Sequence, residues 1–260
     1  MKCNWILILG IFGLSLNAAS GVRAQNRTYR ILSYNIYHGE GMDGKIDLPR
    51  LAKVIKSTEP DLVALQEVDH INRRTGMVDQ TAALSKLTGL NGRFGRQIDF
   101  MGGQYGQAIL SRFPLGESTI HILPGTPVRE TRIAFEVVIR DPSGDISFVS
   151  THLHHNNKVF REQQATTLND IFEKVSRPVI LAGDLNANPD SKPIGILLKG
   201  WKNATTGKEL YTYPSKKPKN QIDYVFVRPR DKFRLLETRV IPEDMASDHL
   251  PILAVLELTP

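Results

Sequence analysis

Residues 178–189 read PVILAGDLNANP, and this stretch indicates the kind of fold that the chain adopts. The apolar run 178–182 predicts a strand, and it follows a segment, 159–175, with a helical pattern. Asp184 and Asn186 come directly after the strand. Since α/β folds present ligands beyond the ends of their strands, this arrangement predicts a functional edge of a sheet.

The same alternation of elements extends from this stretch in both directions. Asp47 fits a helix N-cap with Pro49 in the first turn, and Asp79 and Gly89 fit the two ends of another helix. The pattern predicts helices at 47–57, 79–89 and 159–175, and strands at 29–37, 61–66, 105–111, 116–122, 131–139, 146–150, 178–182, 223–227, 235–241 and 252–258. No repeat or linker divides the sequence, so we expect one mixed α/β domain.

The composition is that of an ordinary globular protein. Of 260 residues, 41% are hydrophobic and 23% are charged, with a single cysteine, which excludes disordered, collagen-like and disulfide-scaffold proteins. The net charge of +6 is compatible with an anionic substrate and is too small for a protein that coats nucleic acid.

The first 24 residues have the pattern of a secretory signal peptide. Lys2 precedes an apolar run over 5–16, and Val22-Arg23-Ala24 supplies small residues at a cleavage site. A membrane-spanning helix needs roughly 20 apolar residues, so an uncleaved anchor is the weaker alternative. We expect cleavage after Ala24, with Ala19 as a second option, and a cysteine-free domain over 25–260. The expected location is outside the cytoplasm, secreted or periplasmic, with no membrane span after cleavage.

Polar residues recur where predicted strands begin or end. These residues are Asn35, Glu67, His152, Asp184, Asn186, Asp223, Asp248 and His249. Taken singly, an acid or amide at a strand end is most often a turn or a cap. Six such places in one chain favour a shared site.

The chemistry of this set is consistent. Carboxylate and amide oxygens without a Cys/His tetrad favour Mg²⁺ or Mn²⁺, with Ca²⁺ as a further candidate, over structural zinc. Histidines beside acids supply acid and base groups for hydrolysis. A metal-assisted attack of water on a phosphoryl group uses both kinds of residue.

Seven motifs carry a resemblance to a known family. They are YNIYHG (34–39), LQEV (65–68), YGQAILSR (105–112), STHLHH (150–155), GDLNANP (183–189), IDYVFV (222–227) and SDHLPI (247–252). In this order they resemble the endonuclease/exonuclease/phosphatase superfamily of deoxyribonuclease-like, metal-dependent hydrolases, and the overall pattern is nearest its small exported members. The resemblance implies a four-layer α/β sandwich, with two mixed, mostly antiparallel sheets face to face and helices outside.

The resemblance also implies roles for the residues at the strand ends. Glu67 would be the principal ligand of a divalent metal, with Asn35 and Asp248 as further ligands. Asp184 would orient or deprotonate the attacking water, and Asn186 would steady the pentacovalent phosphate. His249, oriented by Asp223, and His152 would contact the phosphate or act as acid and base.

Three further residues are predicted to contact substrate. Gln107 stands where many relatives have Asn, Arg132 ends the block Arg129-Glu130-Thr131-Arg132, and His155 matches the family pattern. His154 is expected to face solvent. Arg161 and Gln164 fit either the R-x-x-Q pattern of close relatives or an ordinary solvated helix face.

The substrate is a phosphate-containing molecule: a nucleic acid, a phospholipid head group or a small phosphodiester. The basic cluster Lys216, Lys217 and Lys219 can steer such an anion, although charge runs usually serve solubility. We expect a phosphodiesterase without an obligate protein partner. The alternatives are a phosphomonoesterase or head-group hydrolase, and a non-catalytic phosphate-ligand binding protein on the same fold.

Overall fold

The computed structural model of the chain describes residues 1–2, 27–126 and 130–259. Most of the predicted signal peptide, including its apolar run and cleavage site, and Arg129 lie outside the described residues. The strands are β1 (Arg27–Asn35), β2 (Leu62–His70), β3 (Asn91–Phe100), β4 (Gly103–Ser111), β5 (Leu115–Leu123), β6 (Arg132–Ile139), β7 (Ile146–His152), β8 (Val179–Asp184), β9 (Lys202–Asn203), β10 (Asp223–Arg228), β11 (Phe233–Val240) and β12 (Ile252–Leu258). The helices are α1 (Leu48–Ser57), α2 (Gln80–Thr88), α3 (Lys158–Phe172) and α4 (Lys192–Leu197), with short 3₁₀ turns at Tyr37–Gly39 and Arg73–Thr75.

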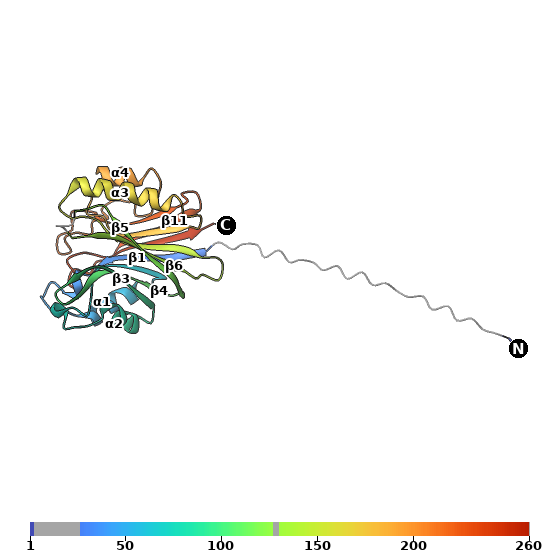
Figure 1. Cartoon of the computed structure of the whole chain (residues 1–260), viewed down its shortest axis with the longest axis horizontal. Coiled ribbons are helices and arrows are strands. Elements are labelled where there is room, and N and C mark those ends of the chain that lie inside the picture. Colours follow the sequence, from blue (N-terminus) through green and yellow to red (C-terminus); the bar gives the residue numbers. More distant parts are fainter. Residues whose placement is uncertain (3–26, 127–129, 260) are drawn as a thin grey trace.

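The strands form two six-stranded sheets, in the orders β11-β12-β1-β2-β4-β3 and β5-β6-β7-β8-β10-β9. Both are mixed and mostly antiparallel, because β1 with β2 and β7 with β8 are the parallel pairs. The sheets lie face to face, with α1 and α2 on one outer side and α3 and α4 on the other (Figure 1). The predicted four-layer α/β sandwich is confirmed.

Three apolar clusters hold the four layers together. The central cluster lies between the sheets and includes Phe135 and Phe148. A second packs α1 against the first sheet through residues such as Leu51, and a third packs α3 against the second sheet through Leu168 and Trp201. Each burial removes apolar surface from water, which is the main favourable contribution to folding.

The predicted ends of the first two helices are confirmed, whereas α3 ends at Phe172, three residues before the predicted end at 175. Asp47 caps α1 by accepting a hydrogen bond from the backbone of Arg50, and Asp79 caps α2 through Ala82. Gly89 ends α2 in the left-handed conformation that glycine adopts without steric cost. Across the described residues, no helix combines the length and apolar character needed to cross a membrane.

Both parallel pairs end at the same edge of the sandwich. Helix α1 crosses between β1 and β2, and α3 crosses between β7 and β8, as parallel pairs require. At the ends of these strands, the Asn35 amide donates a hydrogen bond to Asp184, which links the two sheets directly (3.3 Å). The carboxyl ends of β1, β7 and β8 therefore converge on one place, with Glu67 beside them inside β2, three residues before that strand ends.

Candidate active site

Asn35 and Glu67 form the part of the site that the first sheet contributes. Asn35 Nδ2 donates to Glu67 Oε1 at 3.1 Å, and Asn35 is almost fully buried. Glu67 lies at an irregularity in the pairing of β2 with β4, and its φ of 60° is unusual for a residue with a side chain. The backbone is therefore held in an uncommon conformation where it presents this carboxylate.

Asp184, Asp223 and His249 form a buried group of charged side chains from the second sheet and the loop before β12. Asp184 and Asp223 are directly paired across β8 and β10. His249 Nδ1 lies 2.9 Å from Asp223 Oδ2, and His249 Nε2 lies 3.7 Å from Asp184 Oδ2. Asp223 Oδ1 is buried without a hydrogen-bond partner in the described structure. The three residues are arranged as a carboxylate–imidazole–carboxylate group.

The environment shifts the pKa values of this group in opposite senses. Burial raises the pKa of Asp184 to about 7, and the neighbouring Asp223 charge acts in the same direction. Burial alone lowers the pKa of His249, but the charge and hydrogen bond of Asp223, with Asp184 and Asp248, outweigh it and raise that pKa to about 10. His249 is therefore protonated at neutral pH, while Asp184 titrates near neutrality.

His152 and Asn186 complete the polar edge of the second sheet. His152 pairs with Asp184 across β7 and β8, and its Nε2 lies 3.4 Å from Asp184 Oδ2. Burial, followed by the charges of Arg132 and His249, lowers the pKa of His152 well below its ordinary value, so this imidazole is neutral. Asn186 adopts a positive φ of 48°, and its amide donates to the carbonyl of Leu153.

Glu67, Asn35 and Asp248 fit a divalent cation. Burial raises the pKa of Glu67 and the Asp248 charge raises it further, although the Asn35 hydrogen bond and the charges of His249 and Arg132 act in the opposite direction. A cation bound by their oxygens would relieve this repulsion, and hard oxygen ligands suit Mg²⁺ or Mn²⁺. One ligand atom from each of Asp184, Asp223 and His249 also lies within 4.8 Å of the others, but that set includes an imidazole nitrogen, which suits Mg²⁺ and Mn²⁺ less well than oxygen. We therefore keep the oxygen set as the predicted metal site.

Arg132 and His155 lie together beside these groups. Arg132 is 2% exposed; its Nη2 lies 3.3 Å from His155 Nδ1 and its Nη1 lies 3.2 Å from Glu130. The Arg132 charge acts on the pKa values of both Glu67 and His152. Arg132 Nε is buried without a hydrogen-bond acceptor among the described residues, as expected of a cation that receives an anion.

One expectation about the surroundings needs correction, and one open alternative is decided. His154 does not face solvent, because β7 ends at His152 and the chain turns inward; the side chain is 3% exposed. Arg161 and Gln164 do not form a solvated face. Arg161 donates hydrogen bonds to the carbonyls of His154 and His155. The buried side-chain oxygen of Gln164 accepts a hydrogen bond from the backbone N–H of His154. Both residues therefore shape the loop that presents His155.

The structure does not bring Gln107 to the surface of the site. Its side chain is fully buried between the sheets, and Nε2 donates to the carbonyl of Ile133. Gln107 lies on the face of β4 that is turned toward β6, so its side chain supports the strand that begins with Arg132. Its predicted contact with substrate is not visible in this arrangement.

Sequence reasoning missed two residues on the other side of Glu67. Arg74 lies above the rings of Phe100 and Tyr105. In the sequence, Tyr105 was recognised only as the first residue of the motif YGQAILSR. The signal for Arg74 was Asp69, a second acid two residues after Glu67 that is fully buried and binds Arg74 through two hydrogen bonds. An acid repeated on one face of a strand predicts a buried cation partner.

A family model, the Endonuclease/Exonuclease/phosphatase family, matches residues 32–249. The chain belongs to the endonuclease/exonuclease/phosphatase family. Members of this family hydrolyse phosphoester bonds, typically with a divalent metal. The matched range contains every polar residue described above.

The chain is also similar to individual proteins. Protein cwh43 of Schizosaccharomyces pombe is 28% identical over 152 residues, which are 58% of this chain but only 15% of that protein. An endonuclease/exonuclease/phosphatase of Beutenbergia cavernae superimposes with a TM-score of 0.76 at 24% identity, over 90% of this chain and 72% of the other. The mannosyl-6-phosphatase Bt3783 of Bacteroides thetaiotaomicron gives 0.71 at 18% identity, over 88% and 99%. The solved structures establish the shared fold.

Proposed function

We propose that this protein is a metal-dependent phosphoesterase, and specifically a phosphodiesterase in which water attacks phosphorus. The observation that carries the proposal is the buried His249–Asp223 pair, held against Asp184 at the edge where Asn35 and Glu67 also lie. Acid, base and metal-binding groups on one polar edge are the set that phosphoester hydrolysis needs.

The protonation state of each residue determines its role in the proposed reaction. Asp184, with a pKa near 7, accepts the proton of the attacking water at Oδ2. Protonated His249 stabilises the negative charge on the phosphate oxygens and protonates the departing oxygen. Neutral His152 hydrogen-bonds the phosphate, and Asn186 steadies its oxygens. When bound by Glu67, Asn35 and Asp248, a divalent cation polarises the phosphoryl oxygen.

Arg132 and His155 are the proposed anchors for the phosphate. The Arg132 guanidinium has an unused donor at Nε, and charge-assisted hydrogen bonds from a guanidinium to phosphate oxygens are strong. Both side chains belong to the same polar edge as His152, so a phosphate held there lies within the reach of the catalytic groups. The nearby lysines at 216, 217 and 219 remain candidates for steering.

The test is a hydrolysis assay against a matched panel with Mg²⁺ or Mn²⁺, using Glu67→Gln as the blank. The panel holds plasmid DNA, single-stranded RNA, a chromogenic phosphodiester, sphingomyelin, phosphatidylinositol and a soluble inositol phosphate. We expect EDTA to abolish hydrolysis and added Mg²⁺ or Mn²⁺ to restore it. Activity that survives chelation would overturn the metal assignment. Silence on every substrate, with ligand binding intact, supports the non-catalytic binding protein instead.

The second candidate is a phosphomonoesterase. One observation favours it: a structural relative that aligns over 88% of this chain is named a mannosyl-6-phosphatase. The two activities are separated by whether hydrolysis requires a terminal phosphate.

We further propose that the chain is exported after cleavage of residues 1–24. The support is Lys2, the apolar run at 5–16 and the small residues before Gln25. Amino-terminal sequencing of the protein from the culture medium and from a periplasmic extract should start at Gln25. A chain that keeps residue 1 and stays with the cells would contradict the proposal.

A further inference from the structure

A small cavity opens directly beside Glu67. It measures about 150 Å³ and is lined by Glu67, Arg74, Ile98, Phe100, Tyr105 and Glu130. A water molecule occupies about 30 Å³ of liquid, so the cavity is too large for a single ion or water. It is also well below the ~300 Å³ at which pockets for drug-sized ligands begin. One compact ring fits this space.

Arg74 is fixed in one orientation on the cavity wall. Its Nε and Nη2 donate to the two carboxylate oxygens of Asp69 at 2.7 and 2.9 Å. Its guanidinium carbon lies 4.9 Å from the centre of the Phe100 ring and 5.5 Å from that of Tyr105. Nη1 is the nitrogen that this clamp leaves for a ligand. Because Asp69 balances its charge, Arg74 acts as a rigid donor and not as a free cation.

The other walls offer a mixture of donors, acceptors and apolar surface. Burial raises the pKa of Tyr105 well above its ordinary value, with Glu67 acting in the same direction, so its hydroxyl stays protonated and donates. Gln97 and Arg132 both engage Oε1 of Glu130. Ile98 and Phe100 supply the apolar part.

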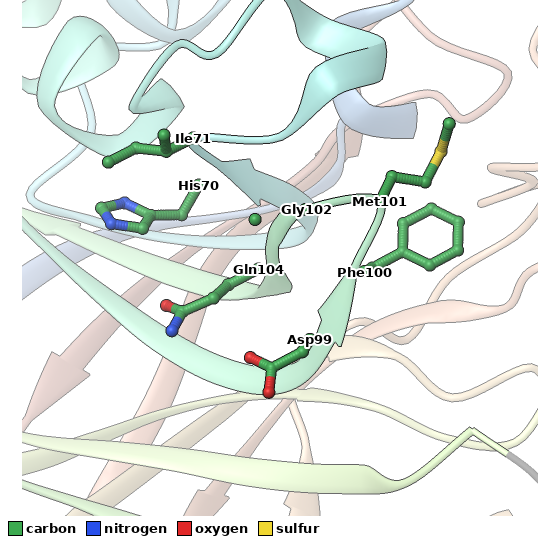
Figure 2. A pocket seen from close by; sticks show the side chains of 8 residues that line it. His70, Ile71, Asp99, Phe100, Met101, Gly102 and Gln104 are labelled. Atoms are coloured by element: carbon green, nitrogen blue, oxygen red, sulfur yellow. The ribbon is translucent and has the colours of Figure 1, made fainter.

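Phe100 separates this cavity from a larger one on its other side. The outer cavity, about 610 Å³, lies at the end of the β3–β4 hairpin and includes His70, Phe100 and Gln104. Figure 2 shows Phe100 and Met101 extending to one side of the hairpin end, with His70 and Gln104 on the other. The two cavities therefore share Phe100 as a wall.

We propose that the inner cavity binds a single polyhydroxylated ring, a sugar or cyclic polyol, that is esterified to the phosphate at the metal site. Such a ring presents both hydroxyl and C–H groups, which match Arg74 Nη1, the Tyr105 hydroxyl, Glu130 Oε2 and the apolar walls. A fatty chain would leave these polar groups unpaired, which is costly. The inference rests on the proposed phosphoesterase function and names the class of its substrate.

The experiment compares two pairs of esters that differ only in ring hydroxyls. The diesters are p-nitrophenyl phosphates of glucose (through O6) and of cyclohexylmethanol, and the monoesters are glucose 6-phosphate and cyclohexylmethyl phosphate. The purified protein with Mg²⁺ should favour the glucose member by on the order of tenfold or more in kcat/KM, since a site built for hydroxyls rejects the analogue that lacks them.

Two variants test the walls. Ile98→Phe fills the cavity and Glu130→Gln removes an acceptor charge, and each should reduce the preference for the glucose ester at least threefold. Ile122→Phe and Glu117→Gln, exposed changes on β5, are the matched controls and should leave the preference unchanged. Thermal unfolding of each variant separates a folding defect from loss of the subsite.

The outcomes distinguish this inference from the proposed function. Equal hydrolysis of both members of a pair overturns the subsite and leaves the phosphoesterase intact. If no ester is hydrolysed, the proposed function fails, and calorimetric titration with glucose 6-phosphate decides the inference. Binding that Ile98→Phe weakens supports it, and no binding by the unaltered protein overturns it.

Discussion

The imidazole of His249 and the carboxylate of Asp223 are joined by a hydrogen bond of 2.9 Å that is closed off from solvent, with neither residue more than 4% exposed. This bond fixes the imidazole so that Nε2 is directed toward Asp184. A carboxylate in this position keeps a histidine in one tautomer and stabilises its protonated form.

Replacing Asp223 by Asn should therefore disable the site while leaving the fold intact. The amide cannot stabilise the charged imidazole, so the pKa of His249 falls from its raised value. We expect kcat to drop on the order of 10²-fold or more. Steady-state kinetics and NMR titration of the His249 ring measure the two effects, and Asp145→Asn, on the surface away from the site, is the control. An unchanged rate would mean that the pair is only structural.

Metal binding should depend on Glu67 more than on the buried group around His249. Glu67→Gln should weaken Mn²⁺ binding at least ~10-fold in isothermal calorimetry, because it removes the charge of the main ligand. Glu59→Gln, a change on the exposed surface after α1, should have no effect. If Asp223→Asn weakens Mn²⁺ binding more than Glu67→Gln does, the ion belongs between Asp184, Asp223 and His249.

Gly183 should not tolerate a side chain. A Cβ atom at this position would lie 1.8 Å from the backbone oxygen of Thr151, so β7 and β8 would have to separate. We expect Gly183→Ala to destabilise the protein by about 2 kcal/mol or more, beyond the usual range for a backbone substitution. Urea unfolding measures the change.

Gly195 provides the matched control for that substitution. It lies in α4, and a Cβ there would meet nothing within 4 Å. Gly195→Ala should leave stability unchanged or raise it by up to ~1 kcal/mol, since alanine is the better helix former. Equal destabilisation by both changes would contradict the role given to the close strand contact.

Glu136 should make stability depend on acid pH. Burial raises the pKa of this carboxyl, but hydrogen bonds from His121 and Ser147 outweigh it, and the folded-state pKa is lowered. A group with a depressed folded pKa contributes stability that is present above its unfolded pKa, near 4.3, and is lost as pH falls through the folded value.

The corresponding variant is Glu136→Gln. At pH 7 it should cost about 1.5–3 kcal/mol, because a buried charged acceptor is lost. Between pH 5 and pH 3 the variant should lose less stability than the unaltered protein. Urea unfolding across this range, with Glu117→Gln as the exposed control, decides the matter; parallel curves would rule out Glu136 as a source of the dependence.

The sequence predicted those features that local chemistry determines. Asp47 and Asp79 have side chains that cap the start of a helix, and Gly89 can adopt the left-handed conformation found at the end of one. Each stands at the helix boundary where it was expected. The short helix α4 was missed because six residues are too few to show a helical period. β3 was not delimited because it carries glycines and charged residues on an exposed edge.

Residues at strand ends were predictable as a set, but how deeply each side chain is buried was not. Whether His154 is buried depends on where β7 ends and on Gln164, a residue from the following helix. The burial of Gln107 depends on β6, the facing strand of the other sheet. Asp69 was the sequence signal for Arg74, but only the structure shows that Asp69 is buried. The surroundings of each residue in the folded chain, and not the residue type alone, decided these cases.

Because the site is built from strands that are far apart in the sequence, its residues are synthesised at different times. Asn35 and Glu67 are synthesised early, Asp184 much later, and His249 only just before β12, the strand that pairs with β1. A nascent chain that stops before Asp248 holds Asn35 and Glu67 but lacks Asp248, the imidazole of His249 and a complete first sheet. Hydrolytic activity should therefore appear only after β12 has been synthesised and has paired with β1, and chains shortened before Asp248 should be catalytically silent.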